Sequence, residues 1–113
     1  MFNEVIVIGK LVNEPTIKET HDGKKMSVIV LDVLRPYRNN LGIRDHDYIS
    51  CVLWQGVANQ VKDCCEIGSF LGIRGRLQSR SFESDEKHST TFMEVKVEHV
   101  EFLDKYFFHE KLR

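Results

Sequence analysis

A single segment of helical periodicity, at residues 57–65, interrupts a chain whose other apolar residues mostly alternate as they do in β-strands. Its apolar residues follow the i, i+4, i+7, i+8 spacing of one helix face, and Gly68 lies just beyond them as a helix stop. The residues of this face are Val57, Val61, Cys64 and Cys65. We therefore expect one helix of about ten residues in a chain made mostly of strands.

Strands are expected on both sides of this helix. They span residues 5–12, 25–34, 47–54, 70–81 and 90–103, with a short extended piece at residues 16–20. Both faces of the first strand are apolar, as in a strand that is buried on two sides. Three strands, one helix and two strands is the order of the oligonucleotide-binding (OB) fold. We therefore expect an all-β fold, a five-stranded OB barrel whose helix lies between its third and fourth strands.

The length of 113 residues fits one domain. We assign residues 1–104 to the barrel and residues 105–113 to a short tail that carries Tyr106, Phe107 and Phe108. No stretch is long and apolar enough to cross a bilayer, and the first residues lack the basic start of a signal peptide. The sequence therefore predicts a protein of the cytoplasm, with no membrane partner.

Catalytic and metal-binding motifs are missing from the sequence. The three cysteines form no CxxC pair, and the five histidines have no HxxxH spacing. There is no GxSxG nucleophile elbow and no Walker loop. We therefore expect a protein that is not an enzyme and that needs no metal or other cofactor, with its cysteines as buried thiols in a reducing compartment.

Four aromatic residues fall where an OB barrel presents its open face, on strands two and three and the adjoining loops. Tyr48 and Trp54 share a parity on the third strand, so both side chains project from the same face. Tyr37 is expected in the loop after the second strand and Phe82 at the end of the fourth. The alternative is that these rings fill the barrel core.

Arginines cluster beside these rings, although the net charge is −1 and the sequence pI is about 6.5. Six of the seven arginines lie in two blocks that contain no acidic residue. Residues 33–44 include Arg35, Arg38 and Arg44, and the second block includes Arg74, Arg76 and Arg80. Guanidinium groups among aromatic rings are typical of a groove that stacks unpaired bases and neutralises phosphates. The alternative is a solvated face of the sheet.

Two blocks of sequence carry a resemblance to a known family. VIGKLVNEP at residues 7–15 and the stretch from DYISCVLW to GRLQSRSFE at residues 47–83 resemble bacterial single-stranded DNA-binding proteins, and the match runs from Met1 to about Leu103. The resemblance implies a homotetramer, a dimer of dimers, that binds single-stranded DNA. It places base stacking at Tyr37, Tyr48, Trp54 and Phe82. It places phosphate contacts at Lys10, Arg35, Arg74, Arg76 and Arg80.

The departures from the family pattern remove positive charge. Asp32 stands where a small residue is common, and family members often have a basic residue at several positions that are acidic or neutral here: Glu4, Gln55, Gly56, Glu66 and Ile67. We therefore expect weaker or more salt-sensitive binding of DNA. The acidic, Phe-ending tip of the family is missing, so recruitment of replication and repair enzymes through such a tip is not expected.

Two other hypotheses stay open. One is a primosome-type OB-fold paralogue, which would be dimeric and chiefly a protein adaptor. The other is an interaction module that binds no DNA and joins a full-length partner in mixed oligomers.

Overall fold

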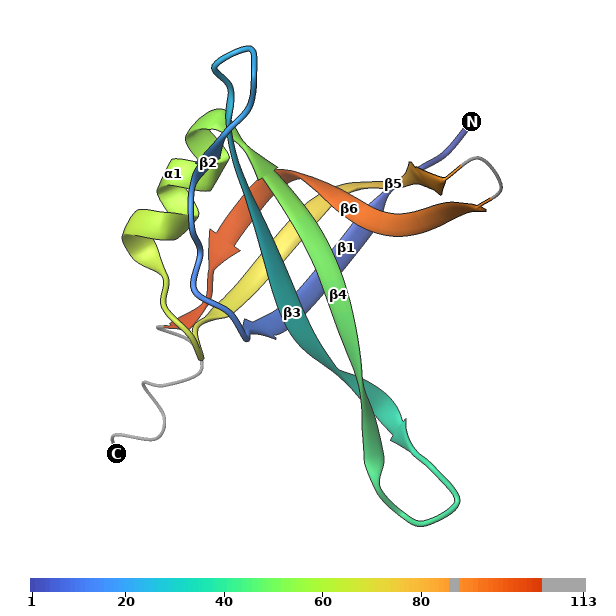
Figure 1. Ribbon diagram of the computed structural model, residues 1–113. Coiled ribbons are helices and arrows are strands. Elements are labelled where there is room, and N and C mark those ends of the chain that lie inside the picture. The colour runs from blue at the N-terminus through green and yellow to red at the C-terminus, as the bar shows by residue number, and fades with distance from the viewer. Residues whose placement is uncertain (86–87, 105–113) are drawn as a thin grey trace.

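The computed structural model describes residues 1–85 and 88–104, in which long strands surround a closed core and one helix lies at its side (Figure 1). The elements are β1 (Val5–Leu11), β2 (Lys18–Glu19), β3 (Lys25–Arg38), β4 (Arg44–Trp54), α1 (Gln55–Cys64), β5 (Phe70–Asp85) and β6 (His88–Phe102). The expected tail residues Tyr106, Phe107 and Phe108 lie outside the described residues. No helix within the described ranges is long and apolar enough to span a membrane.

The five long strands close into a barrel. Their order is β1-β5-β6-β4-β3, and β3 returns to β1 through the pairs Lys10↔Asp32 and Leu11↔Leu31. Neighbours are antiparallel except β4 and β6, which run parallel at Cys51↔Val95 and Val52↔Lys96. The helix joins the third and fourth long strands, β4 and β5. The all-β prediction of an OB barrel with this helix position is confirmed.

The barrel core is aliphatic. Its largest fully buried side chains include Leu11, Leu31 and Leu53, and each of these comes from a different strand. Ala58 and Val61 of α1 are also completely buried in this cluster. The helical periodicity arises because this one face of α1 must cover the barrel while its other residues meet solvent.

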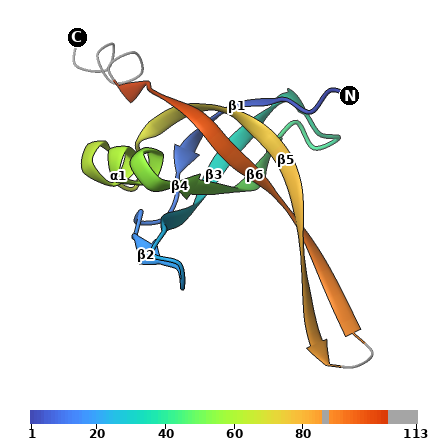
Figure 2. The ribbon, with the colours of Figure 1, turned by 90° about the horizontal axis from the view of Figure 1, so that it is seen from above.

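Two hairpins project from the barrel, β3–β4 and β5–β6 (Figures 1 and 2). Both are longer than the sequence predicts. The expected loop after residue 34 is wrong, because β3 continues to Arg38 and places Tyr37 in a strand. The register shifts between Leu34 and Arg38, where Pro36 lacks an N–H to donate, and pairing then resumes at Arg38↔Arg44.

The expectation that the cysteines are all buried is wrong, because Cys64 is exposed on the solvent side of α1. The fold therefore predicts an order of reaction for the three thiols. Burial raises the pKa of the Cys51 thiol to about 12 and that of the half-buried Cys65 thiol to about 11, whereas Cys64 is exposed. Because the thiolate is the nucleophile, N-ethylmaleimide near pH 8 should label Cys64 first, Cys65 more slowly and Cys51 only on unfolding. Mass spectrometry of timed samples measures this order, with denatured protein as the control. Rapid labelling of Cys51 in the native state would contradict the closed core.

Candidate nucleic-acid interface

The side chains of β4 alternate between the barrel core and the outward side, on which Val52 is nevertheless completely buried. Cys51 and Leu53 are completely buried, whereas Tyr48, of the other parity, is 66% exposed. Trp54 shares the parity of Tyr48 and is half-buried at the end of the strand. Neither ring belongs to the buried core cluster. We call the outward side of β3, β4, β5 and β6 the outer face.

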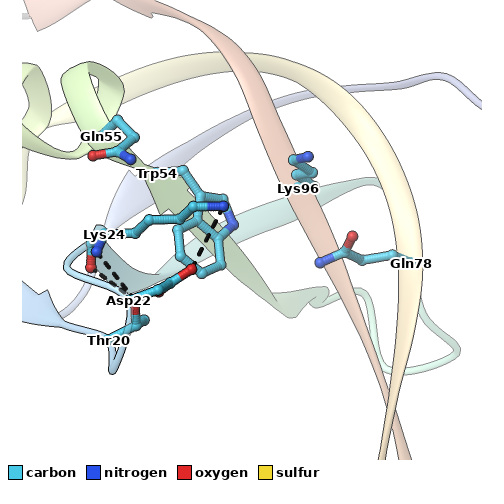
Figure 3. Close-up of a pocket in the computed structure, with 7 residues that line it drawn as sticks. All are labelled: Thr20, Asp22, Lys24, Trp54, Gln55, Gln78 and Lys96. Atoms are coloured by element: carbon cyan, nitrogen blue, oxygen red, sulfur yellow. Dashed lines mark hydrogen bonds and ion pairs between the residues drawn. The ribbon is translucent and has the colours of Figure 1, made fainter.

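Trp54 forms one wall of a pocket of about 460 Å³ on the outer face (Figure 3). The other lining residues come from four different parts of the chain: Thr20, Asp22 and Lys24 from the turn between β2 and β3, Gln55 from α1, Gln78 from β5 and Lys96 from β6. An indole ring beside two ammonium groups and two amides is suited to a nucleotide, which offers a flat base and an anionic phosphate.

The charges of this pocket are unequal. Lys24 lies 3.7 Å from Asp22, and the hydrogen bond from Thr20 lowers the pKa of the Asp22 carboxyl. Lys96 makes no ion pair with any residue in the described part of the chain. Lys96 is therefore the cation of this pocket that is best placed to meet an anion.

A second group of the outer face surrounds Tyr48. Its ring stacks on that of His46, with 6.4 Å between centroids and 17° between planes. Asp32 is the direct cross-strand partner of Tyr48 and pairs with the ring nitrogen of His46. Lys10 is the partner of Asp32 on β1, and its ammonium group lies 5.5 Å from the centre of the Phe70 ring. A carboxylate therefore separates the Lys10 cation from the Tyr48 ring.

The arginines of β5 project from one side of the strand, as their spacing predicts. Arg74 and Arg76 are exposed and alternate with the buried Ile73 and Gly75. Arg76 lies only loosely against Glu98, at 3.9 Å, and Arg74 forms no ion pair with the residues that the structure describes. Both guanidinium groups are therefore open to phosphates in the single chain, and Arg74, the cross-strand partner of Ile6, borders the outward side of β1.

Arg80 is different, because a carboxylate already neutralises it. Its Nε and Nη2 donate to the same Glu94 oxygen at 3.1 and 2.7 Å, and Gln78 donates to that oxygen at 3.2 Å. Glu94 is only 8% exposed. A phosphate that approached Arg80 would have to compete with this carboxylate.

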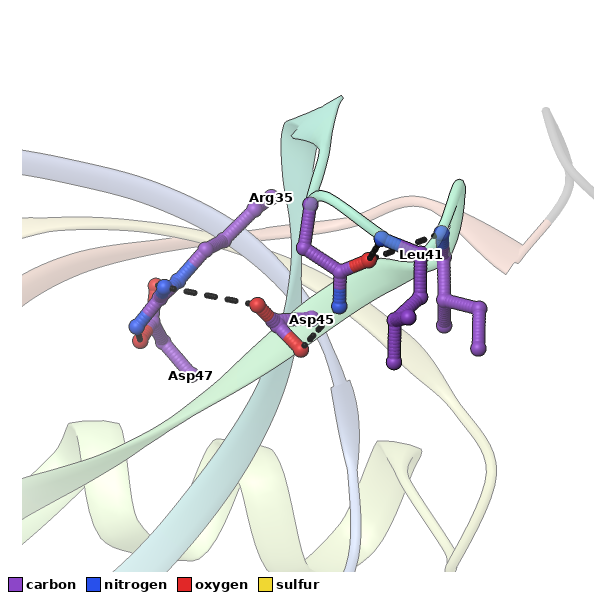
Figure 4. A network of polar contacts seen from close by, with 6 residues as sticks. Arg35, Leu41, Asp45 and Asp47 are labelled. Atoms are coloured by element: carbon purple, nitrogen blue, oxygen red, sulfur yellow. Dashed lines mark hydrogen bonds and ion pairs between the residues drawn. The ribbon is translucent and has the colours of Figure 1, made fainter.

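Arg35 is likewise paired. Its Nε and Nη2 donate to the two carboxylate oxygens of Asp47 at 3.0 and 2.8 Å, and Asp45 lies 3.8 Å away (Figure 4). These hydrogen bonds lower the pKa of Asp47 and raise that of Arg35. Because Asp45 and Asp47 alternate with His46 and Tyr48, Arg35 lies on the opposite side of the β3–β4 hairpin from Tyr48.

The remaining predicted residues lie on the two hairpins. Arg38 donates to the backbone carbonyl of Gly42 at 2.8 Å, within the β3–β4 hairpin, and Tyr37 beside it is exposed. Phe82 is exposed on β5, and its ring centre lies 6.0 Å from the guanidinium carbon of Arg80. Tyr37 and Phe82 therefore flank the barrel instead of filling it.

Three residues on or beside the outer face could not be identified from the motifs of the sequence: Lys24, Lys96 and Phe92. Phe92 is 52% exposed and contacts Phe82 edge to face, with 5.6 Å between ring centroids. Its parity matches that of Lys96, so the alternation along β6 could have indicated both. Their partners on β5 depend on the hairpin register, which alternation alone does not define.

Comparisons with known proteins identify the family of this chain. The profile of the Single-strand binding protein family matches residues 2–103. Single-stranded DNA-binding protein B of Bacillus subtilis is 35% identical over 104 residues, which are 92% of each chain. Single-stranded DNA-binding protein A of Bacillus subtilis and the Single-stranded DNA-binding protein of Halalkalibacterium halodurans are 35% and 36% identical over 92% of this chain. The chain spans only 60% and 62% of these two longer relatives. The chain therefore belongs to the single-strand binding protein family.

Proposed function

We propose that this protein binds single-stranded DNA without sequence preference and without catalysis. The observation that carries the proposal is the set of rings outside the buried core, Tyr48, Trp54 and Phe82. Among the cations of the candidate site, Lys10, Arg74 and Lys96 make no ion pair within the described residues. Each ring can stack on any base, and the cations neutralise phosphates. Such binding protects DNA that is unpaired during replication, recombination, repair or uptake, and it places the protein at the nucleoid, in the cytoplasm.

Titration with poly-dT at two salt concentrations tests this function. Trp54 is the one tryptophan of the chain, so its fluorescence reports on the pocket directly. We expect quenching at low salt and a much smaller apparent affinity at high salt, because counterions are released on binding. Duplex DNA hides its base faces and should compete poorly. Unchanged fluorescence at low salt would refute the proposal.

The ion pairs of the arginines predict how much each arginine contributes to the salt dependence of DNA binding. Arg74→Ala with Arg76→Ala should flatten the plot of log affinity against log salt concentration by about one to two units, since each residue releases its own counterion. Arg35→Ala and Arg80→Ala should each flatten it by clearly less, because Asp47 and Glu94 already neutralise these side chains. Fluorescence titrations over a salt series give the slopes. An equal change of slope per substituted arginine in all of these variants would show that the ion pairs open when DNA binds.

The outward side of β1 supports a proposal for the assembly. Ile6 and Ile8 project from it and are 72% and 55% exposed, which is unusual for isoleucines in a regular strand. We propose that this side is covered by a second copy of the chain, as the first step towards a homotetramer built as a dimer of dimers. Light scattering should give the mass of a tetramer for the wild type and a smaller mass for Ile6→Glu with Ile8→Glu. A monomeric wild type would exclude this assembly.

One observation favours a second candidate function, that of a primosome-type adaptor with weak or no DNA binding. Asp32, Asp47 and Glu94 each pair with a basic side chain of the predicted site, which lowers the positive charge available to DNA. If the protein is such an adaptor, light scattering should give the mass of a dimer and poly-dT should not change the fluorescence of Trp54. The same two measurements therefore separate the candidates.

A further inference from the structure

The β5–β6 hairpin carries a pair of aromatic rings outside the barrel, of which only Phe82 matches the stacking pattern of the family. Phe92 pairs in register with Arg80, two positions nearer the barrel than the Phe82↔Thr90 pair. The two rings touch with 5.6 Å between centroids and 69° between planes. Both stay about half exposed, so their mutual contact does not bury them.

These rings contribute little to the core of the barrel. The buried residues of β6 begin at Glu94 and Val95, whereas Phe92 and Met93 are both exposed, on opposite sides of the strand. A ring of this size usually gains stability by burial, roughly 1.5–3 kcal/mol for a whole side chain. Phe92 forgoes much of this gain, so its surface stays open to an interaction with another molecule.

Charge and position both indicate nucleic acid as that molecule. The guanidinium carbon of Arg80 lies 6.0 Å from the centre of the Phe82 ring, which places a cation beside the aromatic pair. Phe92, Glu94 and Lys96 share the outward side of β6, and Lys96 lines the Trp54 pocket. Four residues of extended strand span about 13 Å, so one oligonucleotide can contact both the pocket and the rings.

We propose that Phe92 is a further base-stacking residue, which forms with Phe82 a two-ring site for one unpaired nucleobase on the β5–β6 hairpin. The inference rests on the proposed function, which it deepens by naming a contact. The open surface of Phe92 offers a π-face to the base, and Lys96, which makes no ion pair with the described residues, lies on the same side of β6 for a phosphate farther along the strand.

Photo-cross-linking tests this contact directly. Oligo-dT that carries 5-iododeoxyuridine forms a covalent bond on irradiation with an aromatic ring against which the base lies. Trypsin should cut after Arg80, Lys87 and Lys96, which puts Phe82 and Phe92 in the separate peptides 81–87 and 88–96. We expect tandem mass spectrometry to locate cross-links at Phe92 as well as at Phe82. Cross-links at Trp54 and Phe82 without any at Phe92 would overturn the inference.

Variants of the same strand provide the energetic test. Phe92→Ala should weaken oligo-dT binding about tenfold (~1.4 kcal/mol), and Phe92→Tyr should retain the affinity because it keeps the ring. Phe92→Leu separates stacking from apolar packing, since leucine is apolar but has no π-face. We expect it to bind as weakly as Phe92→Ala. Wild-type affinity for the leucine variant would overturn the inference.

Met93→Ala is the matched control. Met93 is the next residue, with a similar exposed fraction of 57%, but it projects from the other side of β6. Its substitution should leave the affinity for oligo-dT unchanged. An equal loss of affinity for Met93→Ala and Phe92→Ala would overturn the inference, because it would indicate a general effect on the hairpin.

If Phe92→Ala binds oligo-dT normally while Trp54→Ala does not, the inference fails and the proposed function stands. If the wild type binds no oligo-dT at low salt, the proposed function itself fails.

Discussion

Trp54→Ala is expected to weaken the binding of single-stranded DNA tenfold or more while the barrel stays folded. The indole forms a wall of the pocket on the outer face, and a stacked base is worth roughly 1–3 kcal/mol, against ~1.4 kcal/mol for each factor of ten in affinity. The substitution also removes the fluorescent reporter, so the anisotropy of a labelled oligo-dT should be measured instead. Circular dichroism of the variant verifies the fold.

Trp54→Phe is the control for this prediction. It keeps an aromatic face at the same position on β4 and should retain most of the affinity. An alanine variant that binds DNA as tightly as the wild type would show that the bases lie elsewhere. The positions of Tyr48, Phe82 and Phe92 would then need to carry the stacking without Trp54.

Gly75→Ala is expected to destabilise the fold by about 3 kcal/mol or more. A Cβ atom built at Gly75 lies 2.0 Å from the carbonyl oxygen and 2.9 Å from the carbonyl carbon of Lys96, on the neighbouring strand β6. Both are backbone atoms, so a rotamer change cannot relieve the clash and the two strands must separate. Urea unfolding at a fixed protein concentration measures the change in the free energy of unfolding.

Gly56→Ala is the matched control. Gly56 lies in the first turn of α1, and a Cβ atom there meets nothing within 4 Å. Alanine should stabilise the helix by roughly 0.5–1 kcal/mol, because glycine loses more conformational freedom on folding. A Gly75→Ala variant that unfolds at the same urea concentration as the wild type would contradict the close approach of β5 and β6.

The fold could be predicted because local patterns determine most of it. Val57 and Val61 have the spacing of a helix face, and alternation marks the strands on either side. The bounds of β3 were harder to predict, because Pro36 indicates the end of a strand when it is considered alone. The pairing of Arg38 with Arg44 extends the hairpin past the proline, and this pairing depends on β4.

The candidate site could be predicted in its residue types but not in its electrostatics. The alternation of residues along β4 predicts which side of that strand Tyr48 projects from, and the alternation along β5 does the same for Arg80. It could not indicate that Glu94, which is distant in the sequence, would bind Arg80, because that contact depends on the register of the β5–β6 hairpin. The same limit applies to Arg35, whose partner Asp47 belongs to the other strand of its hairpin.

The two projecting hairpins carry rings that the buried core does not include, whereas Trp54 lies on the barrel itself, next to the buried Leu53. Tyr37, Phe82 and Phe92 all lie on these hairpins, whereas Leu11, Leu31 and Leu53 hold the barrel together. Natural variation can therefore change these half-exposed hairpin rings one at a time at little cost to the buried core. Related barrels can therefore differ widely in their affinity for a ligand, from tight to negligible, while the buried core and the strand order stay the same.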